Sequence, residues 1–269
     1  MKIAPILIFL LLTAGCATSP TGRSQLMLIS PEQAISSSRQ AYIQTLQPLE
    51  QQGLVDADPA MTKRVKDITG RIIAQAIELY PDAKEWDWQI KVIDDPEMVN
   101  AWAMAGGKMA VYSGLIEQLR PTDDELAQVL AHEIGHAVAN HTAERMSVAL
   151  ASQLGVLGLG LAVDSDYRGY ALTGGALAAT VAIGLPNSRT SEAEADQIGI
   201  ELAARAGYNP YAAVTLWEKM AEVGGSSPVE FLSTHPSPGN RQKTLQRLAP
   251  HYMDEYEAPG ERPRYAFAE

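Results

Sequence analysis

The chain contains 269 residues, of which 46% are hydrophobic, 20% charged and 6% aromatic, a composition typical of a folded globular protein. This composition excludes the collagen-like, disordered and disulfide-rich classes. Asp and Glu number 32 against 21 Lys and Arg, which gives a formal net charge of −11. So acidic a chain is unsuited to nucleic acid, because phosphate contacts require clustered basic side chains. A simple membrane span is not expected either, since no run of 18 apolar residues occurs.

The first residues predict export and lipid attachment. A lysine at the second position precedes the apolar run Ile3–Leu12, which is too short to span a bilayer but suits the core of a secretory signal. The only cysteine of the chain, Cys16, follows directly after small residues. This pattern resembles a bacterial lipoprotein signal, with Thr13 standing where that pattern prefers Leu. We expect residues 1–15 to be removed and Cys16 to be lipidated; the alternative is an ordinary signal peptide with an incidental cysteine.

This resemblance also implies a location. Ala17 follows the cysteine where an inner-membrane retention signal would carry Asp, which favours an outer-membrane lipoprotein facing the periplasm. With Cys16 acylated, no thiol remains for a disulfide, so stability must come from core burial and from any bound metal. Residues 16–29 are rich in Ser, Thr and Gly, and we expect them to form a lipidated tether.

Two helices are predicted before residue 80. The sequence Ser-Pro-Glu-Gln at 30–33 supplies an N-cap, a proline at the first helical position and a glutamine three residues on, so a helix is expected to about Gln52. Asp58 and Pro59 begin a second helix in the same way, and it is expected to end near Tyr80.

A short group of strands follows. Apolar residues alternate with polar ones, as in a strand, at Trp86, Trp88, Ile90 and Val92. Val99–Ala105 and Lys108–Ser113 flank Gly106-Gly107, which predicts a hairpin with a two-residue turn. The capping box Thr-Asp-Asp-Glu at 122–125 begins a helix that is expected to reach about Met146.

The remaining chain predicts a helix-dominated α+β fold. The apolar stretches Val148–Val163 and Ala171–Leu185 are short for membrane spans, so we expect packed core helices or a hairpin near a cleft. Further helices are predicted at Ser188–Ala206, Pro210–Val223 and Pro238–Ala249. Long helices with one group of strands define α+β. One domain is expected at residues 30–250, followed by an acidic surface tail at 251–269.

The sequence His-Glu-Ile-Gly-His at 132–136 lies within one predicted helix. His132 and His136 are one turn apart on the same face, so both imidazoles can reach one ion. Neutral imidazoles bind Zn²⁺, whose open fourth position holds a water with a pKa of about 7. Glu133 is near enough to accept that water's proton and later deliver it to the leaving amine. The alternative is a structural pair of surface histidines.

A third ligand must come from elsewhere in the chain. His141 is about 180° around the helix from His132 and is interpreted as a surface or packing histidine. Glu192 and Asp196 lie on one face of a later helix, from which Glu194 points about 160° away. Glu192 can complete a His₂Glu site while Asp196 accepts a ring N–H of a ligand histidine. Taken alone, this segment is merely an acidic, Ala-rich helix.

Four segments together resemble one known family, the zinc metalloendopeptidases that include HtpX and the CAAX prenyl proteases, and especially its lipoprotein members of the LoiP type. They are the strand pair Asn100–Leu115, the histidine motif His132–His136, the helix Arg189–Asp196 and the late His-Pro segment Thr234–Arg241. Ala105 departs from the family pattern, which usually has Pro before the two glycines. The resemblance implies a gluzincin-like zinc peptidase with a small sheet or hairpin beside the active-site helix.

The resemblance also implies site roles and one Zn²⁺ per subunit. It makes His132, His136 and Glu192 the zinc ligands. It makes Glu133 the general base and acid, and Asp196 the carboxylate that orients a ligand histidine.

Two further roles come with the resemblance. His235 would donate to the oxyanion of the tetrahedral intermediate, although by itself it reads as an ordinary loop residue. A strand is expected to pair with the extended substrate backbone, through Asn100, Ala101, Trp102 and Ala103.

The sequence therefore predicts a Zn²⁺-dependent endopeptidase, tethered to the membrane by lipid, that hydrolyses misfolded or surplus cell-envelope proteins. One alternative is a periplasmic chaperone or assembly factor that works with the outer-membrane assembly machinery and cleaves little. A second is a structural zinc site closed by a fourth protein ligand. Against this second alternative, no fourth His or Cys stands at ligand spacing in the sequence.

Overall fold

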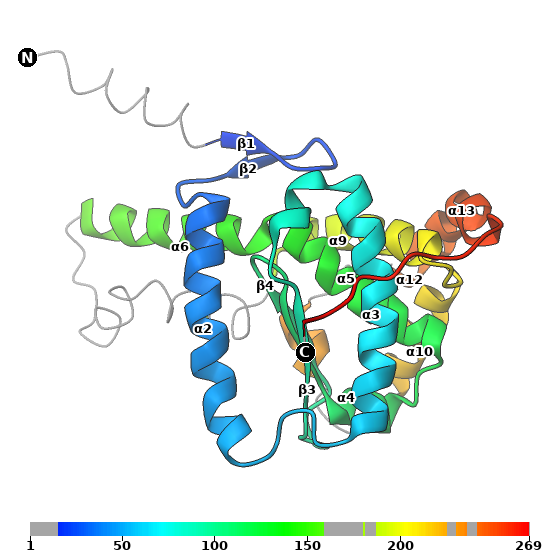
Figure 1. The fold of residues 1–269 in the computed structure, drawn as a ribbon. Helices are drawn as coiled ribbons and strands as arrows, with labels where there is room; N and C mark the ends of the chain where they lie inside the picture. The colour runs from blue at the N-terminus through cyan, green and yellow to red at the C-terminus, as the bar shows by residue number, and fades with distance from the viewer. Residues whose placement is uncertain (1–15, 159–179, 181–186, 225–229, 236–240, 269) are drawn as a thin grey trace, which may run out of the picture.

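The computed structural model describes residues 16–158, 180, 187–224, 230–235 and 241–268, and this part of the chain is mostly helical (Figure 1). The longer helices are α2 (Pro31–Gln51), α3 (Pro59–Leu79), α5 (Asp123–Val138), α6 (His141–Gly158), α9 (Arg189–Arg205) and α10 (Ala212–Gly224). The shorter ones are η1 (Pro81–Glu85), α4 (Ser113–Leu119), α11 (Glu230–Thr234), α12 (Arg241–Leu248), η3 (Ala249–Tyr252) and α13 (Met253–Glu257). The strands are β1 (Cys16–Thr18), β2 (Ser24–Leu26), β3 (Gln89–Ile93), β4 (Ala101–Met104) and β5 (Lys108–Tyr112). The predicted helix-dominated α+β class is confirmed.

The first two helices begin where the sequence predicts. Ser30 and Gln33 form a capping box at the start of α2. Asp58 accepts hydrogen bonds from the first backbone N–H groups of α3. In Figure 1 the two helices stand on either side of the three-stranded sheet, α2 near β4 and β5 and α3 near β3.

The three-stranded sheet has β5 at its centre, parallel to β3 and antiparallel to β4. The predicted hairpin forms, but its connection is Ala105–Gly107, three residues instead of two. Gly106 and Gly107 have φ values of 78° and 75°, a region that favours glycine. β3 begins only at Gln89, because Trp88 packs against the hairpin: a Cβ on Gly107 would lie 2.4 Å from its ring.

Helix α5 begins at the predicted capping box of Thr122 and Glu125. The prediction that this helix continues to about Met146 is wrong, since α5 ends at Val138. Asn140 has a φ of 56°, in the left-handed region that Asn tolerates better than most residues, and α6 begins directly after it. The regular helical rotation assumed across this turn therefore does not apply.

Strands β1 and β2 form an antiparallel hairpin at the N-terminal end of the described residues. Gln25 is buried in this hairpin and donates from Nε2 to the carbonyl oxygen of Ala139, at 2.8 Å. The prediction of a tether at residues 16–29 is therefore corrected, because polar side chains of the segment bind it to the domain. Cys16 begins β1, but its side chain lies outside the described part, so its lipidation stays a prediction.

The later helices fall close to their predicted positions. Ser188 caps α9, and its hydroxyl accepts from the N–H of Ser191. α10 begins at Ala212, two residues later than predicted. The start of the helix predicted at Pro238–Ala249 lies outside the described residues, and α12 is described from Arg241. The main core lies between the sheet, α3, α5 and α9.

The two apolar stretches are only partly described. α6 continues to Gly158, so the first stretch is helical to that point, and Val148 at its beginning is 49% exposed and not in the core. The rest of Val148–Val163, almost all of Ala171–Leu185 and the signal at 1–15 lie outside the described residues. Among the helices that the structure describes, none combines the length and apolarity needed to cross a membrane.

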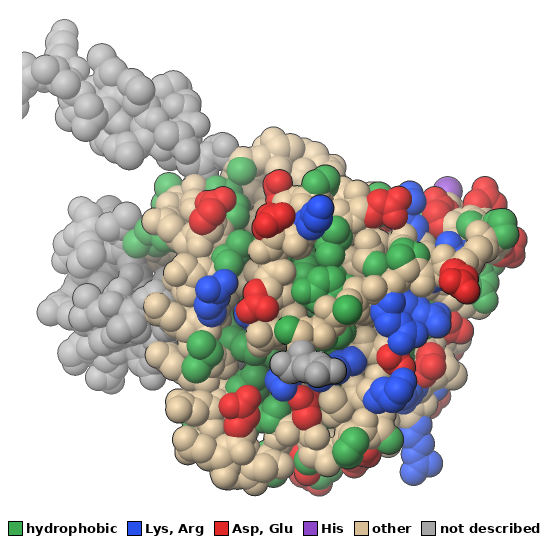
Figure 2. Space-filling model, viewed as in Figure 1, with side chains coloured by type: hydrophobic (Ala, Val, Ile, Leu, Met, Phe, Trp, Pro, Cys, Tyr) green, Lys and Arg blue, Asp and Glu red, His purple; other side chains and the backbone are tan. Residues whose placement is uncertain are grey.

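Residues after α13 run back over α3 (Figure 1). The N–H of Tyr265 donates to the carbonyl oxygen of Gly70 at 2.8 Å, and Tyr265 and Phe267 pack against the main core. The sequence predicts an acidic surface tail at 251–269, and most of this segment is attached to the domain by these contacts. On the face shown in Figure 2, acidic and basic side chains are interspersed.

Candidate metal centre

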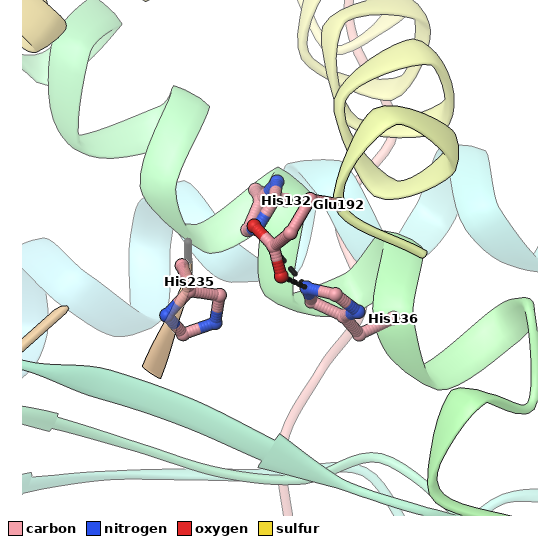
Figure 3. A group of neighbouring side chains, drawn as sticks. All are labelled: His132, His136, Glu192 and His235. Atoms are coloured by element: carbon pink, nitrogen blue, oxygen red, sulfur yellow. Dashed lines mark hydrogen bonds and ion pairs between the residues drawn. The ribbon is translucent and has the colours of Figure 1, made fainter. Parts of the chain in front are cut away.

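Two buried helices, α5 and α9, cross at close range and bring their polar residues together. A Cβ on Gly199 would lie 2.9 Å from the backbone of His132, and a Cβ on Gly135 would lie 2.9 Å from the carbonyl oxygen of Ala195. Only glycine permits this approach. Sequence reasoning did not predict this role for either glycine. A glycine inside an amphipathic helix is costly, and this position could have indicated a close helix crossing. The approach places Glu192 of α9 beside the histidines of α5 (Figure 3).

The three expected ligands meet at short distances. His132 Nε2 and His136 Nε2 lie 3.1 Å apart. One carboxylate oxygen of Glu192 lies 3.3 Å from the first of these nitrogens, and the other lies 3.2 Å from the second. All three side chains are buried, that of Glu192 completely. The structure therefore joins the two imidazoles and the carboxylate that the sequence singles out.

Asp196 and Arg241 hold this group in place. Asp196 Oδ1 lies 3.0 Å from His132 Nδ1. Because an ionised carboxylate only accepts hydrogen bonds, Nδ1 carries the hydrogen and Nε2 faces the group of ligands. Arg241 donates to Glu192 Oε2 at 2.9 Å and to Asp196 Oδ1 at 2.5 Å. Its guanidinium also lies over the ring of Trp217, 4.1 Å from the centroid.

His141 does not face away from the site, as the sequence predicts, and is not a surface residue. It is buried, with its Nδ1 2.7 Å from Nδ1 of His136 and its Nε2 3.1 Å from Oε2 of Glu194. The turn at Asn140 is the reason, since it brings the start of α6 back against α5 and lets His141 reach Glu194 of α9. That asparagine is the local signal that sequence reasoning passed over.

The donor set fits a divalent cation such as Zn²⁺, because two imidazoles and a carboxylate are common zinc ligands. Oε1 of Glu192 is buried and makes no hydrogen bond within the described part. Burial lowers the pKa of His136 well below its ordinary value, so this imidazole is neutral. The pKa of His132 is lowered by burial and by the charge of Arg241. Hydrogen bonds with Asp196 and Glu192 outweigh both effects and raise it to about 9. A cation bound here would displace that proton.

His235 supplies a fourth donor to the same group. Its ligand atom and those of the three expected ligands all lie within 4.8 Å of one another. The argument that no fourth histidine stands at ligand spacing is therefore wrong, because α11 carries a distant histidine to the site. The ring of His235 stacks on Phe231, with centroids 4.2 Å apart. Its Nδ1 lies 3.1 Å from the carbonyl oxygen of Phe231, and its Nε2 lies 3.2 Å from Oε1 of Glu133.

The expected substrate strand lies at one edge of the three-stranded sheet. Asn100 precedes β4, whose first residues are Ala101, Trp102 and Ala103. Within the described part, β4 pairs only with β5 and packs against α5. All four residues are buried, backbone and side chain together. Pairing with a substrate at this edge stays a prediction.

Known proteins resemble the chain over most of its length. A model of peptidase family M48 matches residues 54–249. Metalloendopeptidase OMA1, mitochondrial, of Homo sapiens is 34% identical over 251 residues, which cover 86% of this chain and 45% of the human protein. Mitochondrial metalloendopeptidase OMA1 of Arabidopsis thaliana is 39% identical over 158 residues, 59% of this chain and 31% of its own. Beta-barrel assembly-enhancing protease of Escherichia coli is 32% identical over 191 residues, 68% of this chain and 38% of its own.

This chain thus spans less than half the length of each of these relatives. The matched residues nevertheless include all the helices that form the candidate metal centre. The predicted resemblance to a zinc metalloendopeptidase family is confirmed, while the finer likeness to lipoprotein members stays a prediction. The chain belongs to peptidase family M48.

Proposed function

We propose that the chain is a zinc-dependent endopeptidase whose metal is held by His132, His136 and Glu192. The observation that carries this proposal is the buried meeting of these three side chains beside Glu133, in a chain of a peptidase family. When bound, Zn²⁺ supplies Lewis acidity, which polarises a peptide carbonyl and lowers the pKa of a water to about 7.

Glu133 is placed to move the protons of the reaction. Its Oε1 is buried and lies 3.2 Å from His235 Nε2, but within the described part it accepts no hydrogen bond. A buried carboxylate oxygen without a donated hydrogen is costly, so it is suited to engage a proton of water or of the substrate. Glu133 takes a proton from the attacking water and delivers it to the leaving amine.

The fourth donor, His235, favours one alternative function, a structural zinc site with four protein ligands. Its Nδ1 lies 3.0 Å from Thr234 Oγ1 and 3.1 Å from the carbonyl oxygen of Phe231, and its Nε2 faces the ligand group. Donation to an oxyanion requires a hydrogen on Nε2, whereas ligation requires that Nε2 carry none. His235→Ala separates the two: the oxyanion role predicts slower cleavage with zinc retained, and the structural role predicts loss of zinc.

The substrates we propose are misfolded or surplus cell-envelope proteins, met at the outer membrane in the periplasm. The signal-like residues 1–15 and the lipidation predicted at Cys16 support this location. The likeness to a protein named beta-barrel assembly-enhancing protease supports work on envelope proteins and contact with the outer-membrane assembly machinery. The edge of β4 would pair with extended substrate backbone. An assembly factor with little cleavage remains the alternative.

Zinc content and cleavage of unfolded casein by the purified protein test the proposal. We expect one Zn²⁺ per subunit and cleavage that stops on chelation and resumes when zinc is returned. His136→Ala should lose the metal, and Glu133→Gln should keep the metal but lose cleavage. An inert wild-type protein that holds its zinc would overturn the proposal. Holding activity that survives in Glu133→Gln, beside an inert wild type, would favour the assembly factor.

A further inference from the structure

A continuous series of hydrogen bonds joins the N-terminal hairpin to the candidate metal centre. His136 Nδ1 lies 2.7 Å from His141 Nδ1, and His141 Nε2 lies 3.1 Å from Glu194 Oε2. In the turn between β1 and β2, Arg23 donates from Nε to the same carboxylate oxygen at 2.8 Å. Thr21 donates its hydroxyl to the other oxygen of Glu194 at 2.6 Å. Four separate segments of the chain thus meet behind one expected ligand.

The chemistry of the donors fixes the direction of these bonds. Glu194, as a carboxylate, only accepts, so His141 Nε2 carries a hydrogen. With its hydrogen on Nε2, His141 presents the lone pair of Nδ1 to the Nδ1–H of His136, 2.7 Å away. The other nitrogen of His136, Nε2, is left without a hydrogen and faces Glu192 and His132. The series therefore selects the tautomer of His136 that can bind a cation.

Glu194 can play this part because it is buried among hydrogen-bond donors. Its side chain is 3% exposed. His141 Nε2, Arg23 Nε and the Thr21 hydroxyl all lie within hydrogen-bonding distance of its two carboxylate oxygens. A buried carboxylate needs such partners, since an unpaired one is strongly destabilising.

Arg23 is itself fixed by a second carboxylate. Its two terminal nitrogens each donate to one oxygen of Glu144 at 2.6 Å, a bidentate pair on α6. Gln25 adds a hydrogen bond to the same carboxylate at 3.0 Å. Arg23 therefore bridges α6 and α9, and its planar fork matches both partners in a way that the ammonium of Lys cannot.

We infer that the hairpin of residues 16–26 is a built part of the metal centre, in which Arg23 is a positioning residue that acts on His136 through Glu194 and His141. This inference rests on the proposed function only in that His136 binds the metal. It also means that the segment predicted to carry the lipid cannot be removed without loosening the centre.

Zinc affinity of the purified full-length protein, measured by competition with a chelator, tests the inference. Arg23→Gln should weaken zinc binding about tenfold, in the range usual for groups that orient a metal-binding histidine. Arg23→Lys should restore part of the loss. The visible spectrum of the Co²⁺-substituted protein should change in Arg23→Gln, because the orientation of His136 changes. The matched control is Arg264→Gln. It removes the ion pair between Arg264, in the C-terminal segment, and Asp67, and neither residue contacts the metal centre.

A double variant tests whether Arg23 acts through His141, and a milder variant covers the case of poor folding. If Arg23 acts through His141, the double variant Arg23→Gln/His141→Gln should bind zinc no more weakly than His141→Gln alone. Additive losses would overturn the inference, as would a wild-type affinity and Co²⁺ spectrum in Arg23→Gln. Should Arg23→Gln fold poorly, Thr21→Val removes one hydrogen bond to Glu194 and should give a smaller loss of zinc affinity; an unchanged affinity would count against the inference. A wild type that binds zinc but cleaves nothing would defeat the proposed function and leave this inference standing.

Discussion

The two expected histidine ligands receive their support from different kinds of structure. His132 is oriented by Asp196, which lies one helical turn from Glu192 on the same helix, α9. His136 is oriented by His141, which follows a turn at the end of α5 and is backed by the N-terminal hairpin. The first support comes from one neighbouring helix with Arg241 of α12 behind it, and the second is assembled from more segments, including the N-terminal hairpin.

This difference has a structural consequence. The support of His132 requires that α9 dock on α5 and that Arg241 of α12 hold Asp196. The support of His136 additionally requires the start of α6 and the turn near Arg23 to be in place. The two sides of the centre can therefore be weakened independently, and variants can show whether they are in fact separate.

The largest effect on activity is expected at Glu133, which lies between the two supported histidines in the sequence. Glu133→Gln should lower kcat about 10²- to 10⁴-fold, because the amide cannot accept the proton of the attacking water. Zinc content should stay at the wild-type level, since Glu133 is not among the expected ligands. Casein cleavage and metal analysis on the same sample measure both. Glu201→Gln, which alters a half-buried ion pair on α9, is the control and should cleave normally. Substantial activity in Glu133→Gln would mean that another group takes the proton.

The comparison itself is tested by removing each support in turn. Asp196→Asn and His141→Gln should each weaken zinc binding about 10- to 100-fold. Asp196→Asn should have the larger effect, because it also breaks the contact with Arg241. Since the two supports lie on different elements, the losses should add in the double variant. Chelator competition measures all three, and strong non-additivity would show that the two sides form one network.

Sequence patterns predicted the features that lie within regular helices and failed for those that join separate segments. Caps and helical periodicity placed α2, α3 and α9, and spacing within single helices paired His132 with His136 and Glu192 with Asp196. Periodicity failed where the chain stops being regular. A single left-handed residue ended α5 early and reversed the side on which the next histidine lies. The hairpin's contacts were missed, and His235 was expected at the site only as an oxyanion donor, not as a fourth donor atom beside the ligands. These contacts join segments far apart in the sequence, which no local pattern encodes.

The close crossing of α5 and α9 underlies both supports and gives the third prediction. Gly199→Ala places a methyl group 2.9 Å from the backbone of His132, where no flexible side chain can move aside. We expect a loss of about 1–3 kcal/mol in the free energy of unfolding, together with weaker zinc binding. Urea titration measures the first quantity and chelator competition the second. Gln197→Ala, at an exposed position of the same helix, should change stability by less than about 0.5 kcal/mol. Unchanged stability in Gly199→Ala would show that the helices can separate slightly without cost.

The smallest expected effect is a pH dependence of stability, which tests how Arg23 holds the hairpin in place. Burial raises the pKa of both Glu194 and Glu144, but hydrogen bonds from His141 to the first and from Arg23 to the second leave both below their ordinary value of 4.5. A carboxyl whose pKa is lower in the folded than in the unfolded chain stabilises the fold above that ordinary value. It loses this contribution as the pH falls through the folded value.

Removing Arg23 removes part of that lowering. The difference in stability between the metal-free wild type and Arg23→Gln should therefore be greatest near about pH 7 and shrink as the pH falls below 4.5. Urea midpoints of both proteins across this range measure the difference, with Arg264→Gln as the exposed-pair control. A difference that stays constant with pH would mean that Arg23 holds the hairpin by packing alone, and that the ionised carboxylates behind His141 do not depend on it.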